Sequence, residues 1–391
     1  MSLRFLERSF SLKVTGLITE YNPFHSGHQY HMDEARRLTG ADAILVVMSG
    51  NFVQRGLPAI TDKYSRTRMA LTAGADAVIE LPLAAATGSA EYFASGAVQT
   101  LNACGCVTDL VYGCECDPPE LLAPIARLLS EEPDSFRAAL QENLRSGLSY
   151  PAARSLAIQK ILPDFGRILD LPNNILGIEY QKALIQTGSP IRPHGLVRRG
   201  IGYHQSASSI REAAAAGSLD RMTGYLPDFV RKELTTPLLA DDLMLLLLYR
   251  LRILSTEELT TYFDVSPELA ARIHRGYQGI DRWDTLVQTL ASRNRTRTHI
   301  QRALIHILTG LTREEARKEP TALRLLGFRK GSPLLRALKD HAQLPVVTKL
   351  ADAPADAFSA EIRAADIYRL VQQARSGALF PDEYHAGPVI L

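Results

Sequence analysis

The sequence predicts an α/β fold in two parts: a Rossmann-like domain built on a parallel sheet, followed by a mainly α-helical C-terminal domain. Short apolar runs alternate with helical stretches as far as about residue 216, an order typical of a parallel sheet covered by helices. Beyond about residue 224 the pattern becomes almost wholly helical. In such sheets ligands bind at the carboxyl ends of the strands, so functional residues are expected there.

Four strands are predicted before residue 115, separated by helices. The run 43–48, Ala-Ile-Leu-Val-Val-Met, is apolar throughout, which is typical of a strand buried on both faces. The predicted strands are 14–20, 43–48, 77–81 and 107–112, and the predicted helices between them are 28–38, 65–73 and 90–102.

Helices predominate after the fourth strand, and one more strand is expected before the sheet domain ends. The predicted helices are 118–142 with a turn at 132–134, 149–162, 175–186 and 206–216, and the strand is 191–197. Further helices are expected at 241–254, 257–262, 267–276 and 282–291. We therefore divide the chain into an N-terminal extension (1–13), a sheet domain (14–220) and a helical domain (221–391), with the boundary within 217–240.

Length and composition indicate an ordinary globular protein. At 391 residues the chain is long enough for two or three domains with separate cores. No stretch approaches the ~20 consecutive apolar residues that a membrane-spanning helix needs. The segment 1–13 lacks the apolar core of a signal peptide. These features predict a cytoplasmic protein that does not act at a membrane.

All four cysteines fall in one short segment, as the pairs Cys104/Cys106 and Cys114/Cys116. The residues between the pairs read as a buried strand, which at about 3.3 Å per residue would hold them about 20 Å apart. One tetrahedral zinc site needs its sulfur ligands much closer together. We therefore expect reduced thiols and no metal site.

Directly after the first strand the chain reads Asn-Pro-Phe-His-Ser-Gly-His, residues 22–28. A strand that breaks at Asn-Pro and enters a helix at Gly-His suits phosphate binding. Gly27 lets a ligand approach the backbone, and the helix N-terminus presents free N–H groups. His25 and His28 can both point at a phosphate and stabilise charge that develops in a transition state. The alternative interpretation is a helix start with two structural histidines.

A second cluster, 204–211, reads His-Gln-Ser-Ala-Ser-Ser-Ile-Arg. Serines at a helix start cap free N–H groups, and an arginine one turn later can hold phosphate oxygens. Alone, this pattern is typical of a capped helix with a surface arginine. After an upstream His-x-Gly-His it resembles the second signature of the nucleotidylyltransferase superfamily. That resemblance implies that Ser208, Ser209 and Arg211 bind the β- and γ-phosphates of a nucleotide.

Longer motifs resemble those of the tRNA(Met) cytidine acetate ligase family. The opening motif, 20–31, reads Glu-Tyr-Asn-Pro-Phe-His-Ser-Gly-His-Gln-Tyr-His, and order and spacing match over roughly 14–215. The other matching segments are 47–56, 79–82, 112–115, 172–177 and 323–328. Two positions depart from the family pattern: Cys114 stands where a small polar residue is expected, and Arg199 where an apolar one is.

The resemblance implies a HIGH-type nucleotidylyltransferase that makes acetyl-adenylate from ATP and acetate, with Mg²⁺. The acetyl group would then pass to N4 of the wobble cytidine of elongator tRNA(Met). On this basis the catalytic residues are His25, His28 and Arg211. The expected ATP-binding residues are Ile18, Thr19, Glu20, Tyr21, Asn22, Pro23, Phe24, His25, Ser26, Gly27, His28, Gln29, Tyr30, His31, Gly113, Asn173, Arg198, Arg199, Ser208, Ser209 and Arg211.

The tRNA is expected on basic surface outside this pocket, where each Lys or Arg neutralises a phosphate. The expected residues are Arg293, Arg295, Arg297 and Arg302, with 329–330 as a second patch. Three further cations, Lys63, Arg66 and Arg68, either face the nucleotide cleft or form a solvated helix face. His31 and His194 are weaker candidates that could equally be structural.

Two other functions stay open on the sequence alone. A small-molecule adenylyl- or cytidylyltransferase would use the same two signatures, although it does not need about 170 further helical residues with an arginine cluster. A non-catalytic, nucleotide-sensing tRNA-binding protein would keep the pocket without the chemistry. The sequence does not indicate the oligomeric state, nor does it distinguish acetate from another short carboxylate.

Overall fold

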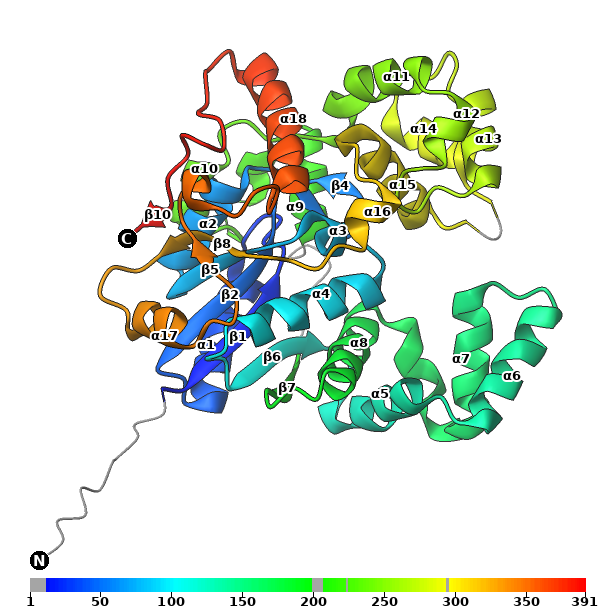
Figure 1. Cartoon of the computed structure of the whole chain (residues 1–391), viewed down its shortest axis with the longest axis horizontal. Coiled ribbons are helices and arrows are strands. Elements are labelled where there is room, and N and C mark those ends of the chain that lie inside the picture. Colours follow the sequence, from blue (N-terminus) through cyan, green and yellow to red (C-terminus); the bar gives the residue numbers. More distant parts are fainter. Residues whose placement is uncertain (1–11, 199–206, 223, 293–294) are drawn as a thin grey trace, which may run out of the picture.

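The computed structural model describes residues 12–198, 207–222, 224–292 and 295–391. Its centre is one eight-stranded sheet in the order β10-β8-β5-β2-β1-β6-β7, with β9 paired to β8 (Figure 1). Within this sheet all paired strands are parallel except β5 and β8. The strands are β1 (Val14–Thr19), β2 (Ala43–Ser49), β5 (Ala77–Leu81), β6 (Asp109–Cys114), β7 (Arg192–Val197), β8 (Leu323–Phe328), β9 (Val346–Val347) and β10 (Val389–Ile390). The predicted α/β fold class is confirmed.

Helices connect the parallel strands and cover both faces of the sheet. They are α1 (Ser26–Thr39), α2 (Lys63–Thr72), α3 (Leu83–Ala86), α4 (Ala90–Ala103), α5 (Leu122–Glu131), α6 (Asp134–Arg145), α7 (Tyr150–Ile161), α8 (Pro172–Gln186) and α9 (Ala207–Ala215). A two-stranded hairpin missing from the sequence prediction, β3 (Phe52–Val53) with β4 (Leu57–Pro58), follows β2.

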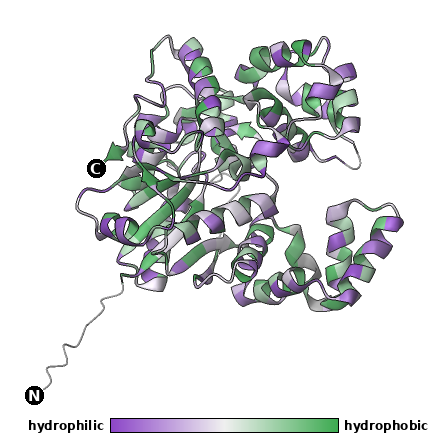
Figure 2. Cartoon of the chain, viewed as in Figure 1, coloured by the Kyte–Doolittle hydropathy of each residue, from purple (hydrophilic) through white to green (hydrophobic). Residues whose placement is uncertain are grey.

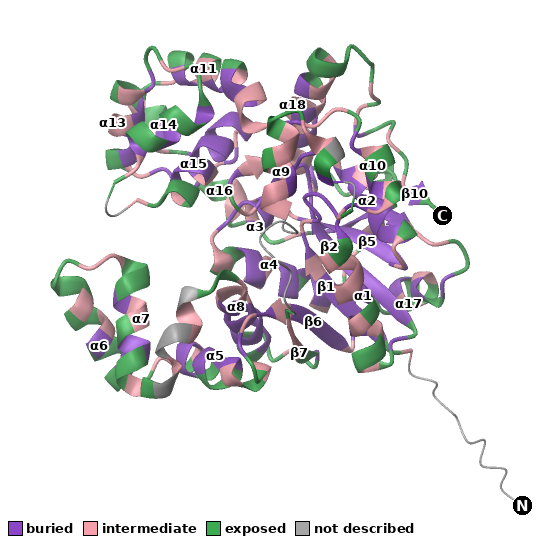
Figure 3. Cartoon of the chain, turned by 180° about the vertical axis from the view of Figure 1, so that it is seen from behind, coloured by how far each residue is buried: buried purple, intermediate pink, exposed green. Residues whose placement is uncertain are grey.

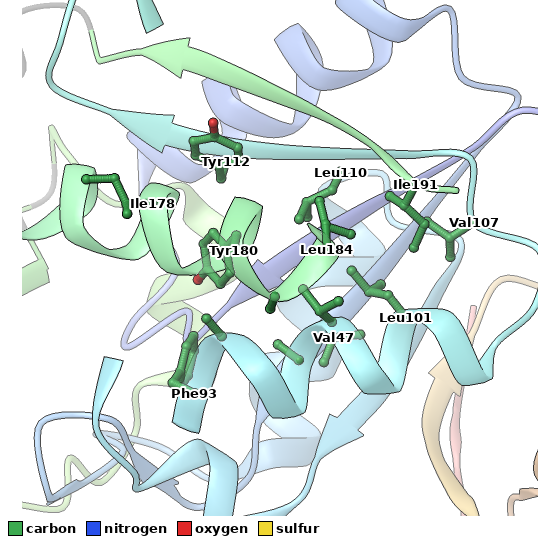
Figure 4. Packing of buried hydrophobic residues seen from close by; sticks show 14 of the residues in the cluster. Val47, Phe93, Leu101, Val107, Leu110, Tyr112, Ile178, Tyr180, Leu184 and Ile191 are labelled. Atoms are coloured by element: carbon green, nitrogen blue, oxygen red, sulfur yellow. The ribbon is translucent and has the colours of Figure 1, made fainter. Parts of the chain in front are cut away.

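The strand β2 shows how the sheet is buried on both sides. Leu45 and Val47 join one apolar cluster with α4 and α8, whereas Val46 and Met48 join a second cluster with α1 and α2. Figure 3 shows the central strands buried, and Figure 4 shows Val47 packed near Leu101 of α4. Successive side chains of a strand point to opposite faces, so a continuously apolar run suits this position.

The chain from residue 240 to residue 316 forms a helical unit with its own core. Its helices are α11 (Met244–Ile253), α12 (Thr256–Leu259), α13 (Pro267–Gly276), α14 (Trp283–Leu290), α15 (Arg297–Thr309) and α16 (Arg313–Ala316). The indole of Trp283 is buried among leucines and isoleucines of these helices. A short helix, α10 (Asp228–Glu233), precedes the unit and packs on α2.

The last part of the chain returns to the sheet instead of continuing the expected helical domain. After β8 come α17 (Pro333–His341), β9, α18 (Ser359–Ser376) and β10. The span 221–391, expected to be mainly helical, therefore contains the helical unit and a segment, 323–391, that extends the sheet. A Cβ on Gly327 would lie 2.7 Å from the Val389 carbonyl oxygen, so glycine permits the close pairing of β8 with β10.

Apolar residues gather in the central strands and polar residues on the outer helices (Figure 2). Within the described ranges, the chain has no helix that combines the length and the apolar character needed to span a membrane.

Candidate active site

A pocket of about 810 Å³ lies at the carboxyl ends of β1, β6 and β7. Its walls come from the segment between β1 and α1, the ends of β6 and β7, the start of α8, the β3–β4 hairpin and the first turn of α15. This is the edge at which ligands bind in a parallel sheet. A larger cavity of about 1010 Å³, between α4 and the C-terminal segment, contains none of the histidines of the motif.

The turn between β1 and α1 is held by hydrogen bonds from distant segments. The Asn22 side-chain oxygen accepts a hydrogen bond from the Ile60 N–H at 2.7 Å, and the Asn22 carbonyl accepts one from Arg211 Nη1 at 2.7 Å. Tyr21 has φ +47°, a left-handed conformation that is uncommon for a residue with a side chain. Its buried ring packs edge-on against Phe24 at 4.8 Å between ring centroids. The path of the motif is therefore fixed by its surroundings.

His25 caps the first turn of α1 and lines the pocket. Its Nδ1 accepts a hydrogen bond from the Gly27 N–H at 3.0 Å. A neutral imidazole that accepts at Nδ1 carries its proton on Nε2, so the Nε2–H group is free to donate to a ligand. The ring stacks on that of His28, with centroids 3.8 Å apart. The His28 Nδ1 is buried and has no hydrogen-bond partner among the described residues.

Both histidines have lowered pKa values and are uncharged at neutral pH. Burial lowers the pKa of His25 to about 4, and the positive charges of Arg198 and Arg211 add to this effect. Burial also lowers the pKa of His28 well below its usual value, with smaller contributions from His25 and His31. A bound anion would favour the protonated imidazoles and raise both pKa values. The site can therefore donate hydrogen bonds to a phosphate, and binding of the phosphate favours uptake of a proton.

The other side of the pocket is built around Glu115, after β6. Its carboxylate accepts hydrogen bonds from the Asn173 side chain and from the Asn174 N–H, and it lies 3.9 Å from Arg198. The buried Asn174 side chain accepts in return from the Glu115 N–H at 2.7 Å. Gly113 opens this wall because it has no side chain, and the stem of Arg198 lies beside it. The arrangement offers a slot of backbone, amide and guanidinium groups next to the histidines.

Comparison with known proteins gives a consistent result over nearly the whole chain. The family model "HIGH Nucleotidyl Transferase" matches residues 12–379. A tRNA(Met) cytidine acetate ligase of Acetivibrio thermocellus is 40% identical over 369 residues, which cover 87% of this chain and 89% of the relative. One from Thermoanaerobacter sp. (strain X514) is 38% identical over 388 residues, covering 93% and 96%. The chain belongs to the tRNA(Met) cytidine acetate ligase family of HIGH nucleotidyl transferases.

A solved structure shares the fold. The crystal structure of Thermotoga maritima TmcAL bound with alpha-thio ATP has a TM-score of 0.91 to this chain. The two are 30% identical in sequence, and the match covers 97% of this chain and 99% of the other. The family resemblance stated from the sequence motifs is therefore confirmed.

Most residues that the family resemblance assigned to ATP line the pocket, and several do not. Phe24 belongs to the apolar core, and Gln29 donates hydrogen bonds to Asp33 and to the Ala73 carbonyl instead. Arg199 lies outside the described residues. The expected residues that line the pocket are Ile18, Thr19, Glu20, Tyr21, Asn22, His25, Gly27, His28, Tyr30, His31, Gly113, Asn173 and Arg198. Those that do not are Pro23, Phe24, Ser26, Gln29, Ser208, Ser209 and Arg211.

Arg211 stands behind the pocket wall and supports it. Its guanidinium donates to the Asn22 carbonyl and, at 3.0 Å, to the Ser208 hydroxyl. Its charge is close enough to lower the pKa of His25. In this structure Arg211 therefore links α9 to the turn that carries the motif, and its expected contact with the phosphates stays a prediction.

Two cations that follow the hairpin are structural and do not face the pocket. Lys63 is buried, and its Nζ lies 2.8 Å from both Glu80 and Glu383. Arg66 is fully buried, and its guanidinium donates to four backbone carbonyls, those of Glu20, Ser49, Gly50 and Thr61. Neither belongs to a solvated helix face, and neither lines the pocket. Arg68 is half-exposed and pairs with Glu233 at 2.7 Å.

The weaker histidine and cysteine candidates also have structural explanations. His194 lies 2.8 Å from the buried carboxylate of Asp109, which also pairs with Arg192 at 2.9 Å. The four cysteines are free thiols, and burial raises the pKa of Cys114 to about 12. The described part of the chain has no group of three or more His, Cys, Asp or Glu side chains that could hold a metal ion.

The expected tRNA-binding arginines differ in how far they reach solvent. Arg297 is half-exposed and pairs with Asp284 at 3.1 Å. Arg295 contacts the Ser266 hydroxyl at 2.9 Å. Arg302 is only 11% exposed and pairs with Asp264 at 3.3 Å, so its place does not suit a phosphate contact. Arg293 lies outside the described residues.

The pocket is also lined by residues outside the expected set, among them Gln54, Arg55, Glu115 and Thr298. Gln54 and Arg55 belong to the 47–56 motif, and Glu115 belongs to the 112–115 motif. The family resemblance covered these segments but assigned no role to the three residues. Thr298 is on α15, in the helical unit, and no sequence pattern indicated that this helix reaches the pocket.

Proposed function

We propose that this protein is an ATP- and acetate-dependent ligase that acetylates N4 of the wobble cytidine of elongator tRNA(Met). The observation that carries the proposal is the pair of stacked, uncharged histidines at the carboxyl end of β1, in a chain that matches acetate ligases over most of its length. A tRNA substrate places the activity in the cytoplasm.

In the first step an acetate oxygen forms a bond to the α-phosphorus of ATP, and the bond to the β-phosphate oxygen breaks. Pyrophosphate leaves and acetyl-adenylate remains. His25 and His28 donate hydrogen bonds to the α-phosphate oxygens, where negative charge must be stabilised in the transition state. Arg198 reduces the repulsion between the two anionic substrates, because its charge lies beside the same histidines.

In the second step the cytidine N4 amine attacks the acetyl carbonyl, AMP leaves, and the amine loses a proton. This step needs mainly positioning, because the mixed anhydride supplies the driving force. Gly113 and Asn173 form the wall against which the adenosine would lie.

Mg²⁺ is expected with ATP, as an ion carried by the phosphates. Magnesium commonly binds substrate phosphates and water with few protein ligands. The described residues contain no acidic cluster that would form a separate site. The roles proposed for His25, His28 and Arg198 require no metal-binding residue.

The test is ATP–pyrophosphate exchange by the purified protein, with and without acetate, followed by nucleoside analysis of tRNA after full turnover. Acetate-dependent exchange and N4-acetylcytidine in elongator tRNA(Met) would support the proposal. Exchange that requires a phosphorylated metabolite instead of acetate would favour a small-molecule adenylyl- or cytidylyltransferase. ATP binding without exchange, even with bulk bacterial tRNA added, would indicate a non-catalytic nucleotide sensor.

A further inference from the structure

Arg55 is an exposed arginine on the pocket wall that has no assigned role. It lies in the turn of the hairpin β3–β4, directly after β2. No carboxylate of the described residues forms an ion pair with it. The two carboxylates of the pocket are engaged elsewhere: Glu115 with Asn173 and Arg198, and Glu20 with the Gln54 N–H at 2.9 Å. An unpaired guanidinium in a pocket favours an anionic ligand.

The hairpin that carries Arg55 is held firmly against the helical unit. Gly56 has φ +69°, and a Cβ at this position would lie 2.2 Å from the backbone nitrogen of Arg302 on α15. Its N–H donates to the Val53 carbonyl at 2.9 Å, which closes the turn. The Gln54 N–H bond to Glu20 ties the same turn to the end of β1. The backbone of Arg55 therefore has a fixed position relative to the motif.

Strand order places Arg55 on the side of the pocket opposite the adenosine wall. From β1 the sheet continues in one direction to β6 and β7, which carry Gly113 and Arg198. In the other direction it continues to β2, which leads into the hairpin. Thr298, on the first turn of α15, lines the same side. If the adenosine lies against Gly113 and Asn173, as proposed, the side next to the helical unit is left for the second substrate.

The positive charge of Arg55 also acts on Arg211, behind the pocket wall. Burial lowers the pKa of the Arg211 guanidinium, the charge of Glu20 opposes this effect, and the charge of Arg55 adds to it.

We propose that Arg55 binds a backbone phosphate of the RNA substrate next to the target cytidine, and so positions the base over the acetyl-adenylate. This inference rests on the proposed function, because it names the residue that holds the acceptor of that reaction. RNA phosphates are the anions that suit an exposed cation at the mouth of a pocket, where counterions are released on binding. Acetate is the competing occupant, and the test below separates the two.

The test compares Arg55→Ala and Arg55→Lys with the wild-type protein in steady-state acetylation of a transcript of elongator tRNA(Met). The expected result for Arg55→Ala is a rise of about tenfold in the KM for tRNA, far exceeding any change in the KM for ATP or for acetate. The slope of log affinity against log salt should become shallower by about one. Arg55→Lys should recover part of the affinity, because the charge is kept.

The matched control is Arg336→Ala. Arg336 is 89% exposed on α17, away from the pocket, and its removal changes the net charge equally. Its KM values should equal those of the wild type. A rise in the KM for ATP or acetate as large as that for tRNA would overturn the proposal and place Arg55 on those substrates. An unchanged tRNA KM and salt slope would also overturn it.

Filter binding of the same transcript measures RNA binding independently of acetylation, so it tests the role of Arg55 separately from the proposed activity. If the wild-type protein bound the tRNA without acetylating it, the proposed function would fail. The affinity and salt slope of Arg55→Ala would still decide whether Arg55 contacts RNA. If the wild-type protein did not bind the tRNA, both proposals would fail.

Discussion

The rings of His25 and His28 are stacked with their centroids 3.8 Å apart, although the two residues are separated by a helix start. This contact is possible because α1 begins at Ser26, with His25 as its cap and His28 in its first turn. Two protonated imidazoles this close would repel each other. Burial lowers the pKa of His28, and the charge that a protonated His25 would carry lowers it further, so the stacked pair favours neutral rings.

Replacing His28 should remove the chemistry and leave RNA binding intact. For His28→Ala we expect acetyl-adenylate formation to fall by about 10²–10³-fold, because one preorganised donor to the developing charge is lost. Pyrophosphate exchange measures this step. Binding of elongator tRNA(Met), measured on the same preparation, should persist. An equal loss of both would mean that His28 has a structural role.

Acidification should destabilise the free protein between pH 6.5 and 4. The pKa values of His25, His31 and His306 are lowered to about 4 by burial, whereas an unfolded chain titrates its histidines near 6.5. The unfolded state therefore binds more protons in this window, and stability is lost as the pH falls. Each unit of pKa difference corresponds to about 1.4 kcal/mol. Urea unfolding from pH 7.5 to 5 measures the slope.

The control for this slope is His306→Gln. His306 is fully buried, contacts the Phe263 carbonyl and Thr87, and lies outside the pocket. The variant should be less stable than the wild type at pH 7.5 and should lose less stability on acidification. If the curves of unfolding free energy against pH were parallel for His306→Gln and the wild type, the lowered pKa of His306 would not contribute to the slope.

Gly56→Ala should displace the hairpin. The substitution adds a Cβ at 2.2 Å from the Arg302 backbone and imposes a left-handed conformation on alanine. Strain of about 1–2 kcal/mol and overpacking of about 1–3 kcal/mol should together lower the free energy of unfolding by about 3 kcal/mol. The matched control is Gly147→Ala, where φ is +83° and no atom lies within 4 Å of the new Cβ. Gly147→Ala should lower the free energy of unfolding only by the backbone strain. Equal losses for the two variants would mean that the clash with Arg302 contributes nothing.

Arg66→Ala should be far more damaging than loss of a surface arginine. It leaves the carbonyls of Glu20, Ser49 and Thr61 without their donor and opens a cavity next to the pocket. We expect a loss of at least about 3 kcal/mol in the free energy of unfolding. Arg68→Ala, two residues away and half-exposed, should cost about 1 kcal/mol or less. Similar denaturant midpoints for the two variants would disprove this difference.

The arginines before and at the start of α15 should contribute to tRNA binding through charge. For Arg295→Ala combined with Arg297→Ala we expect weaker tRNA binding and a salt slope reduced by about one to two. Arg336→Ala with Lys339→Ala removes two exposed charges from α17, at the other end of the molecule, and serves as the control. If both double variants gave the wild-type slope, the arginines of α15 would not contact the RNA.

The parallel strands could be predicted from the sequence because their signal is local. The apolar run of β2 was expected at 43–48 and is observed at Ala43–Ser49. The strand β8 was not predicted, although its residues matched a family motif. Arg324 interrupts its apolar run, and its buried guanidinium donates hydrogen bonds to the Tyr64 hydroxyl and the Thr348 carbonyl. Neither partner is close to β8 in the sequence.

The site shows the same contrast between residues that are close in the sequence, which could be predicted together, and residues that only the fold brings together. His25, Gly27 and His28 lie within one short motif, so the sequence places them together, and all three line the pocket. Lys63 gave no such signal, because its partners Glu80 and Glu383 are distant in the chain. Charged residues are usually solvated, and only tertiary contacts reveal a buried one. Thr298 is a further example, since a helix outside the sheet brings it to the pocket.

The pairing of β8 with β5 has a consequence for synthesis of the protein. A ribosome completes β1, β2 and β5 early, but β8 emerges only after the whole helical unit has been translated. During that interval the apolar strand Ala77–Leu81 is an open edge, able to pair with another nascent chain. Fragments that end before residue 323 should therefore aggregate. During synthesis this edge needs to be shielded until β8 pairs with it.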